Sequence, residues 1–285
     1  MSVRSPHGPG KTLWPAILIA LVFGALLFMY KDVILGMARQ WYEDDNYNHG
    51  FLVPIISGLL LYRCLERMPT LRSASLGAAL PLIIPGYLLF ALGQAAAELF
   101  TLRVSMLLVF WGLVRGIWGR ALFKSLRFPL LFLIFMVPLP YVAFYRVAFP
   151  LQLMSAAASA GVLDFLGVPL VRTGNIIHLS GVSIDVVTAC SGLRSLLALI
   201  TFGTLAAGLF DMRWRLRLLL VLLSVPIAVA TNMLRIIITG ILVHTSGRVF
   251  LAGTLHDALG LLTFALGIGL LFVLGGSFRW RRISA

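Results

Sequence analysis

The sequence predicts a polytopic, all-α membrane protein with about eight transmembrane helices. Of its 285 residues, 60% are hydrophobic and 12% are charged, whereas soluble domains are about 45–50% apolar and about 25% charged. The mean hydropathy is +0.99. Apolar stretches near the length that spans a bilayer, about 20 residues, recur along the whole chain. These values exclude a soluble enzyme, a secreted disulfide scaffold and a disordered adaptor.

Eight apolar stretches are the predicted spans. The second is short and must borrow polar residues such as Asn48 and His49. The seventh contains Pro226 and Asn232, so we expect a kink or a break there. In chain order the stretches are Leu13–Tyr30, Phe51–Leu61, Leu76–Ala97, Leu99–Trp118, Phe128–Phe149, Gly192–Phe210, Leu216–Val243 and Leu255–Gly275.

The distribution of basic residues predicts the topology. A net charge of +13 in a soluble protein would suggest a nucleic-acid partner, but no nucleic acid is expected here. When the eight stretches alternate across the membrane, most of the 23 Lys and Arg residues fall on the side that holds both termini. Cytoplasmic loops carry such an excess, so both termini are predicted to be cytoplasmic.

Two segments on the opposite, outer side are long, Lys31–Gly50 and Pro150–Ala189. The second begins with a helix-like stretch, Leu151–Leu166. Turn signals then separate short β-branched runs, which predicts a small β-hairpin in the outer loop before Cys190. We find no internal repeat. The first apolar run reads as a span rather than a cleaved signal, so the chain is predicted to be a single integral-membrane domain over residues 1–285.

Three polar side chains recur at one depth in consecutive spans. At a rise of about 1.5 Å per residue, Cys190 and His256 each lie about 34 Å from the inner basic residues. Arg235 lies about 27 Å from them by the same measure. The hydrocarbon core is about 30 Å thick. The thiol, the imidazole and the guanidinium are therefore expected together at the outer membrane boundary.

These groups suit nucleophilic catalysis. A thiolate attacks a carbonyl, histidine moves a proton near neutral pH, and arginine stabilises an oxyanion. Each residue alone has a simpler explanation: a Cys that packs, an Arg that snorkels to headgroups, or a His at the surface. Three neighbours are candidates for supporting roles: Arg194 at i+4 from Cys190, Asn232 at i−3 from Arg235, and Asp257 beside His256.

Metal chemistry is the other option for the outer histidines and acids. None of them shows the spacing of an HExxH motif or of another ligand set. No metal site and no cofactor are therefore expected.

Four strings resemble the exosortase/archaeosortase family of membrane cysteine transpeptidases. The resemblance implies that Cys190, Arg235 and His256 are the catalytic residues. It also implies that Tyr47 and His49 of the first string support the site or bind substrate, although the family usually has Ser where Asn48 stands. The strings are NYNHGFLVP (Asn46–Pro54), ACSGLRS (Ala189–Ser195), NMLR (Asn232–Arg235) and HDALG (His256–Gly260).

The resemblance also implies a function. Such enzymes recognise membrane-anchored proteins by a C-terminal sorting signal, which is a short motif such as Pro-Glu-Pro, a membrane helix and a basic tail. They cut near the motif through a Cys thioester and are thought to transfer the protein to a surface acceptor, a lipid or a polysaccharide. Arg194 would then hold an acidic residue of the signal. The expected location is the bacterial inner membrane, with the active site on the periplasmic face.

Two alternatives stay open at this point. A non-enzymatic transporter or assembly subunit for exopolysaccharide would use Arg194 and Arg235 to bind an anionic substrate, and it would not need Cys190. An intramembrane protease would use the same three catalytic residues to hydrolyse the signal without transfer.

Overall fold

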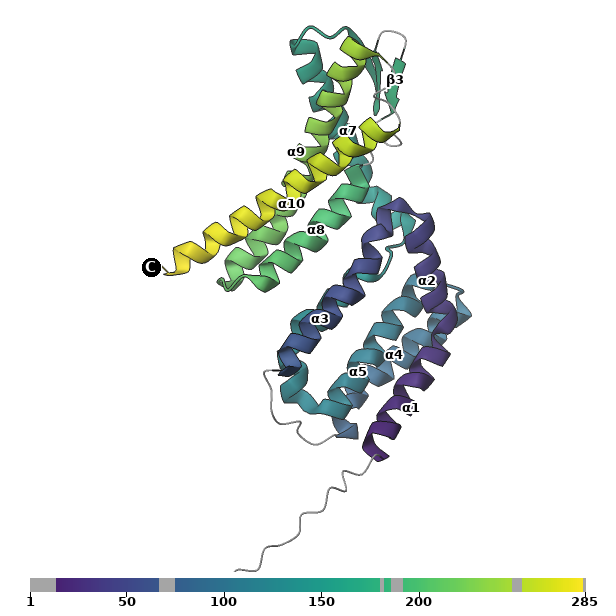
Figure 1. Cartoon of the computed structure of the whole chain (residues 1–285). Coiled ribbons are helices and arrows are strands. Elements are labelled where there is room, and N and C mark those ends of the chain that lie inside the picture. The colour runs from purple at the N-terminus through teal and green to yellow at the C-terminus, as the bar shows by residue number, and fades with distance from the viewer. Residues whose placement is uncertain (1–13, 67–74, 180–181, 186–191, 248–252, 284–285) are drawn as a thin grey trace, which may run out of the picture. The chain divides into compact units, whose positions relative to one another are not determined.

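A computed structural model of the protein describes residues 14–66, 75–179, 182–185, 192–247 and 253–283 (Figure 1). In chain order its elements are α1 (Trp14–Met29), α2 (Lys31–Glu43), the 3-10 helix η1 (Asp45–Phe51), α3 (Leu52–Glu66), α4 (Leu76–Ala95), α5 (Leu99–Ser125), α6 (Arg127–Phe132), the 3-10 helix η2 (Leu133–Met136), α7 (Tyr141–Phe165), β1 (Leu170–Thr173), β2 (Ile176–Leu179), β3 (Val182–Asp185), α8 (Gly192–Leu209), α9 (Trp214–Ser246) and α10 (Thr254–Ile283).

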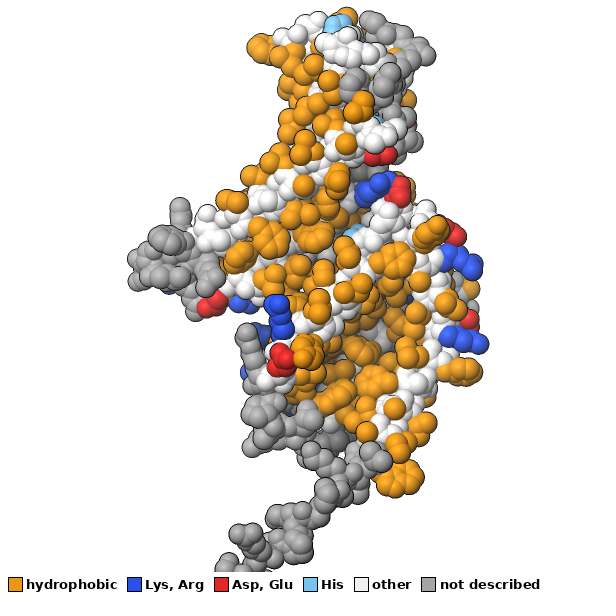
Figure 2. Space-filling view, viewed as in Figure 1, with side chains coloured by type: hydrophobic (Ala, Val, Ile, Leu, Met, Phe, Trp, Pro, Cys, Tyr) orange, Lys and Arg blue, Asp and Glu red, His pale blue; other side chains and the backbone are white. Residues whose placement is uncertain are grey.

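The predicted fold class, a polytopic all-α membrane protein, is confirmed. Among the described residues, six helices are long and apolar enough to cross a membrane. A seventh span results if Ala16–Met29 and Lys31–Glu43, which are bent by 64° at Tyr30, count as one. The sequence predicted about eight spans, and the difference includes α8, whose apolar part Arg194–Leu209 is shorter than the others. Hydrophobic side chains cover most of the helical surface in view in Figure 2.

The chain departs from the predicted spans at its prolines. The predicted span Phe128–Phe149 is interrupted, because α6 and η2 end at Met136 and α7 begins only at Tyr141. Pro138 and Pro140 cause the break, since proline lacks an N–H and disfavours helix in the residue before it. By contrast, α7 continues through Pro150 and α9 through Pro226. The helix-like stretch after Pro150 is therefore part of a candidate span. Of the kink or break expected in the seventh span, the break is absent, because α9 is continuous from Trp214 to Ser246.

Contacts divide the chain into two compact units. The first consists of Met1–Ala38 and Leu61–Arg127, and the second of Arg39–Leu60 and Phe128–Ala285. In the first unit α4 packs closely on α5, because glycines let the two backbones approach. A Cβ on Gly86 would lie 2.7 Å from the side chain of Val109, and one on Gly112 would lie 2.6 Å from Ile83.

The second unit contains a parallel pair of helices. Figure 1 shows α8, α9 and α10 side by side. The fully buried Leu199, Leu220 and Leu271 of the three helices belong to one core cluster. Two edge-to-face ring pairs join α8 to α10, Phe202 with Phe264 at 6.1 Å and Phe210 with Phe272 at 6.0 Å. From the first ring pair to the second, the residue numbers on α8 and on α10 rise by the same amount. The two helices therefore run in the same direction and in register.

A small sheet follows α7, where the sequence predicted a β-hairpin. It has three antiparallel strands in the order β1-β2-β3, so a third strand extends the expected hairpin. Ile177 of β2 and Ile184 of β3 are fully buried and share a core cluster with Leu163 of α7 and Ile236 of α9. One face of the sheet therefore closes over the ends of α7 and α9 (Figure 1).

The last turn of α2 and the segment η1 supply hydrogen bonds to the interrupted stretch before α7. The indole Nε1 of Trp41 donates to the carbonyl oxygen of Met136 at 2.8 Å, and the Tyr47 hydroxyl donates to that of Leu139 at 3.4 Å. Gly50 lies against the Trp41 indole so closely that a Cβ there would overlap the ring. The polar string around η1 thus satisfies carbonyl groups that the proline break removes from helical pairing.

We expect Trp41→Phe to lower the free energy of unfolding by about 1–3 kcal/mol, because it leaves the buried Met136 carbonyl without its donor while it keeps an aromatic ring. Thermal unfolding in detergent would measure the change. Tyr42→Phe is the matched control, since Tyr42 is 82% exposed. Equal midpoints for Trp41→Phe and the wild type would show that this hydrogen bond does not stabilise the break.

Candidate active site

A cavity of about 430 Å³ lies in the second unit. Ligand pockets are typically about 300–1,000 Å³. Its wall is formed by η1 and by the first turns of α3, α8 and α10, together with one side chain of α9. The polar lining residues are Asp45, Asn48, His49, Arg194, Ser195, Arg235 and Asp257, and the others are Leu52, Ala198, Phe202, Gly260, Leu261 and Phe264.

Polar and apolar lining residues are separated along the helices. Arg194 comes at the start of α8 and Phe202 two turns later, and Asp257 precedes Phe264 by the same interval on α10. Since α8 and α10 run parallel, the lining changes from polar to apolar at the same level on both helices. Seven or eight residues of helix correspond to about 10–12 Å. The cavity therefore has a charged end and an apolar end.

A direct hydrogen bond joins Arg235 of α9 to His256 of α10. The Nη2 atom of Arg235 lies 2.7 Å from Nε2 of His256, whose side chain is 7% exposed. A guanidinium can only donate, so Nε2 is the acceptor and the neutral ring carries its proton on Nδ1. The interaction holds the ring of His256 in one tautomer and orientation at the base of the first turn of α10.

The guanidinium of Arg235 rests on Gly260. A Cβ at Gly260 would lie 2.9 Å from Cζ and from Nη2 of Arg235. Any side chain at that position would have to move the guanidinium, because atoms at this distance overlap. Gly260 thus leaves the space in which Arg235 reaches His256, and the HDALG string contains both His256 and this glycine.

Two adjacent acids of η1 have different partners. Asp44 caps η1, since its Oδ1 accepts hydrogen bonds from the backbone N and the side-chain Nδ2 of Asn46, and its Oδ2 accepts one from the Tyr141 hydroxyl at 2.9 Å. Asp45 lines the cavity and forms an ion pair with Arg194 of α8. Among the residues expected from the sequence to support the site, Arg194 thus acquires a partner that the sequence did not indicate.

The remaining expected residues differ in their positions. His49 and Asp257 line the cavity, and the His49 ring makes hydrogen bonds with the backbone of Phe135 and of Asn46. Tyr47 is buried and supports the break before α7 instead of lining the cavity. Cys190 lies outside the described residues; the described part of α8 begins at Gly192.

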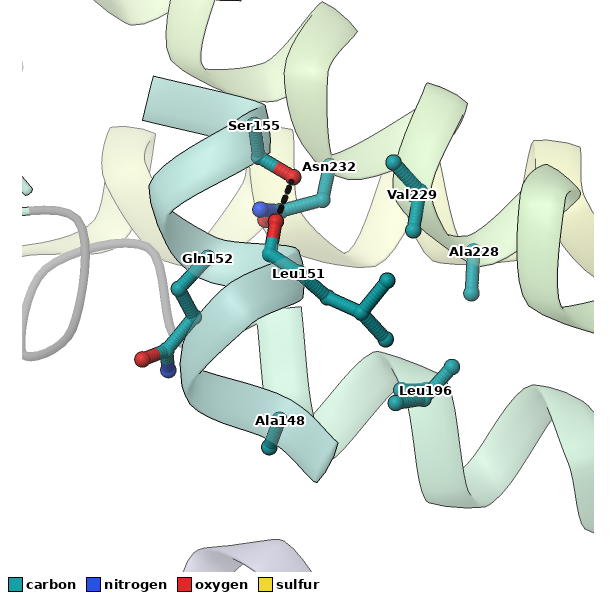
Figure 3. A pocket seen from close by; sticks show the side chains of 8 residues that line it. All are labelled: Ala148, Leu151, Gln152, Ser155, Leu196, Ala228, Val229 and Asn232. Carbon is teal, nitrogen blue, oxygen red and sulfur yellow. Dashed lines mark hydrogen bonds between the residues drawn. The ribbon is translucent and has the colours of Figure 1, made fainter. Parts of the chain in front are cut away.

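Asn232 lines a second, smaller cavity of about 20 Å³ between α7, α8 and α9 (Figure 3). The amides of Asn232 and Gln152 are both buried there, and within the described part of the chain Asn232 Oδ1 has no hydrogen-bond partner. Ser155 instead donates to the Leu151 carbonyl at 2.8 Å. Asn232 precedes Arg235 by three residues on α9, and it lines a cavity separate from the one that Arg235 lines.

Sequence reasoning missed Asp45, Gly260 and the paired rings of Phe202 and Phe264. Gly260 had a signal, because it ends the HDALG string, whereas the pairing of Asp45 depends on a contact between residues far apart in the chain. No three His, Cys, Asp or Glu side chains in the described ranges are close enough to hold a metal ion.

Comparison with known families gives one match. A family model described as "Transmembrane exosortase (Exosortase_EpsH)" matches residues 41–273. The matched part includes η1 and every residue that lines the larger cavity. Neither the curated proteins nor the solved structures compared with the chain contain a match.

The two acids of η1 should respond differently to truncation. We expect Asp44→Ala to lower the free energy of unfolding by about 1–2 kcal/mol, because it removes a helix cap. Asp45→Ala should change it by less than about 0.5 kcal/mol, because exposed ion pairs contribute little. Thermal unfolding of both variants in detergent tests the contrast. Equal destabilisation by the two would mean that the ion pair of Asp45 is structural as well.

Proposed function

Because the chain belongs to the transmembrane exosortase family, which generally consists of cysteine transpeptidases, we propose that it cleaves C-terminal sorting signals of membrane-anchored proteins. The cleaved protein would pass to a surface acceptor, a lipid or a polysaccharide. The multi-pass character of the chain agrees with the family. Membrane-anchored proteins with sorting signals are the substrates that the family implies. The proposed site of action is the periplasmic face of the bacterial inner membrane, with both termini cytoplasmic, and the one-sided distribution of Lys and Arg supports this orientation.

The observation that best supports this proposal is the cavity with a charged end and an apolar end. A sorting signal has the same order, because a short polar motif precedes a membrane helix. The motif would lie among Arg194, Arg235 and Asp257, and the start of the helix would lie against Phe202 and Phe264. A soluble peptide would leave the apolar end unfilled.

In the proposed mechanism Cys190 is the nucleophile. The guanidinium of Arg235 first turns away from Nε2, because this nitrogen has one lone pair and cannot take a proton while it accepts a hydrogen bond. The His256 ring then accepts the thiol proton on Nε2, and the thiolate attacks the scissile carbonyl to form a C–S bond. The released guanidinium donates to the developing oxyanion. His256 then gives the proton to the leaving nitrogen as the C–N bond breaks. An acceptor amine or hydroxyl attacks the thioester and restores the thiol.

The chain order supports Cys190 as the nucleophile. Only one residue, Ser191, separates it from Gly192, where the described part of α8 begins, and Arg194 in the first turn of α8 lines the cavity. The other cysteine, Cys64, lies near the end of α3 and belongs to the first unit, so it does not line this cavity.

We expect Cys190→Ala to abolish processing and Cys64→Ala to leave it intact. The protein would be co-expressed with a substrate that ends in Pro-Glu-Pro, a membrane helix and a basic tail, and the mass of the substrate would be followed. If the substrate loses its tail with the wild type and keeps it with Cys190→Ala, cleavage is established. Any added mass on the substrate identifies the acceptor. If the wild type does not process the substrate and Cys190→Ser still supports exopolysaccharide export, the transporter or assembly subunit is favoured instead, because it needs no thiol.

A second variant tests the pairing of Arg235 with His256. Gly260→Ala should lower the rate of processing by about a hundredfold, because it displaces the guanidinium by an ångström or more. Gly269→Ala is the matched control on the same helix, since a Cβ there meets nothing within 4 Å. The rates would be measured with the same substrate. If Gly260→Ala processed it as fast as Gly269→Ala and the wild type, the proposed role of the Arg235–His256 pair would be contradicted.

A further inference from the structure

We propose that Asp45 is a built-in competitor for Arg194, and that an acidic residue of the sorting signal displaces it when substrate binds. This inference rests on the proposed function and adds a specificity-determining residue to it. In the resting protein the guanidinium of Arg194 would be occupied by a carboxylate of the same chain. Only a segment that brings its own carboxylate would take the place of Asp45.

The contacts of Asp45 fit an exchangeable partner. Its neighbour Asp44 is held by the backbone and side chain of Asn46 and by Tyr141, all within the framework around η1. Asp45 contacts Arg194 across the cavity, far from it in sequence. Two consecutive carboxylates therefore differ in role, because one holds the fold and the other contacts only groups at the cavity.

The exposure of the pair makes exchange inexpensive. The Arg194 side chain is 52% exposed and that of Asp45 is 61% exposed. Ion pairs with this exposure contribute little to stability. When Arg194 leaves, Asp45 still accepts a hydrogen bond from Nδ2 of Asn48 at 3.2 Å and remains open to water. No buried charge is left without a partner on either side of the exchange.

Arginine suits the incoming group. Its planar guanidinium binds a carboxylate through two parallel hydrogen bonds, which a neutral amide cannot match in strength. Arg194 lies at the charged end of the cavity, on the first turn of α8. A glutamate in the motif would reach it while the following helix extends toward Phe202 and Phe264.

The experiment measures binding and does not depend on cleavage. The full chain would carry Cys190→Ala, so that nothing is turned over, and would be placed in nanodiscs. The probes are two fluorescent peptides that contain Pro-Glu-Pro or Pro-Gln-Pro followed by a short apolar segment. Dissociation constants would be compared for the Cys190→Ala parent and for this parent with Asp45→Asn, Arg194→Gln or Asp32→Asn added. Asp32 lies on α2 in the other unit and controls for the loss of one negative charge.

We expect Asp45→Asn to tighten binding of the glutamate peptide by about two- to fivefold, the equivalent of one exposed ion pair. Binding of the glutamine peptide should not change, and Arg194→Gln should remove the difference between the peptides. The inference is overturned if Asp45→Asn weakens binding as Arg194→Gln does, since Asp45 would then position Arg194. It is also overturned if Asp32→Asn tightens binding equally, or if neither peptide binds any variant.

Failure of the proposed function would look different. If the wild type does not process the co-expressed substrate, cleavage is refuted whatever the peptides do. If the wild type processes the substrate but Asp45→Asn leaves both dissociation constants unchanged, only the competition between carboxylates is refuted.

Discussion

The second unit depends on how the carbonyl groups before α7 are satisfied. Pro138 and Pro140 interrupt the helix, and carbonyl groups released in an apolar environment need new donors. Trp41 and Tyr47 supply them, and Ser57 donates to the Pro129 carbonyl at 2.7 Å. Tyr47 belongs to η1, and this segment also carries Asp45, Asn48 and His49 to the cavity. The position of one wall of the cavity is thus set by the need to pair the backbone of another segment.

This arrangement explains why one string of residues serves two purposes. Tyr47 and Gly50 face the break, where one donates a hydrogen bond and the other makes room for the Trp41 indole. Asp45 and Asn48 face the cavity. A 3-10 helix places residues three apart on the same side, so a seven-residue segment can present both sets of side chains. Resemblance in such a string therefore reflects support of the fold as well as chemistry.

Much of the fold was accessible from the sequence, because length, hydropathy and basic residues predict a polytopic helical membrane protein. Helical rise puts Arg235 and His256 at one depth, and their side chains hydrogen-bond in the structure. The break before α7 was not predicted, because Pro150 and Pro226 lie inside continuous helices while Pro138 and Pro140 do not. Composition does not distinguish these cases, since tertiary contacts decide which prolines a helix tolerates. The partner of Arg194 was hidden for the same reason, since Asp45 lies far from it in the chain.

The apolar end of the cavity bears on how the proposed substrate would arrive. Leu52 and Leu261 line it and are 47% and 69% exposed, so apolar side chains of the cavity wall remain uncovered. A helix that diffuses within the bilayer would meet this opening sideways, without its apolar surface entering water. Its search is then confined to two dimensions, and encounter depends on the number of molecules per unit area of membrane instead of their concentration in the surrounding solution.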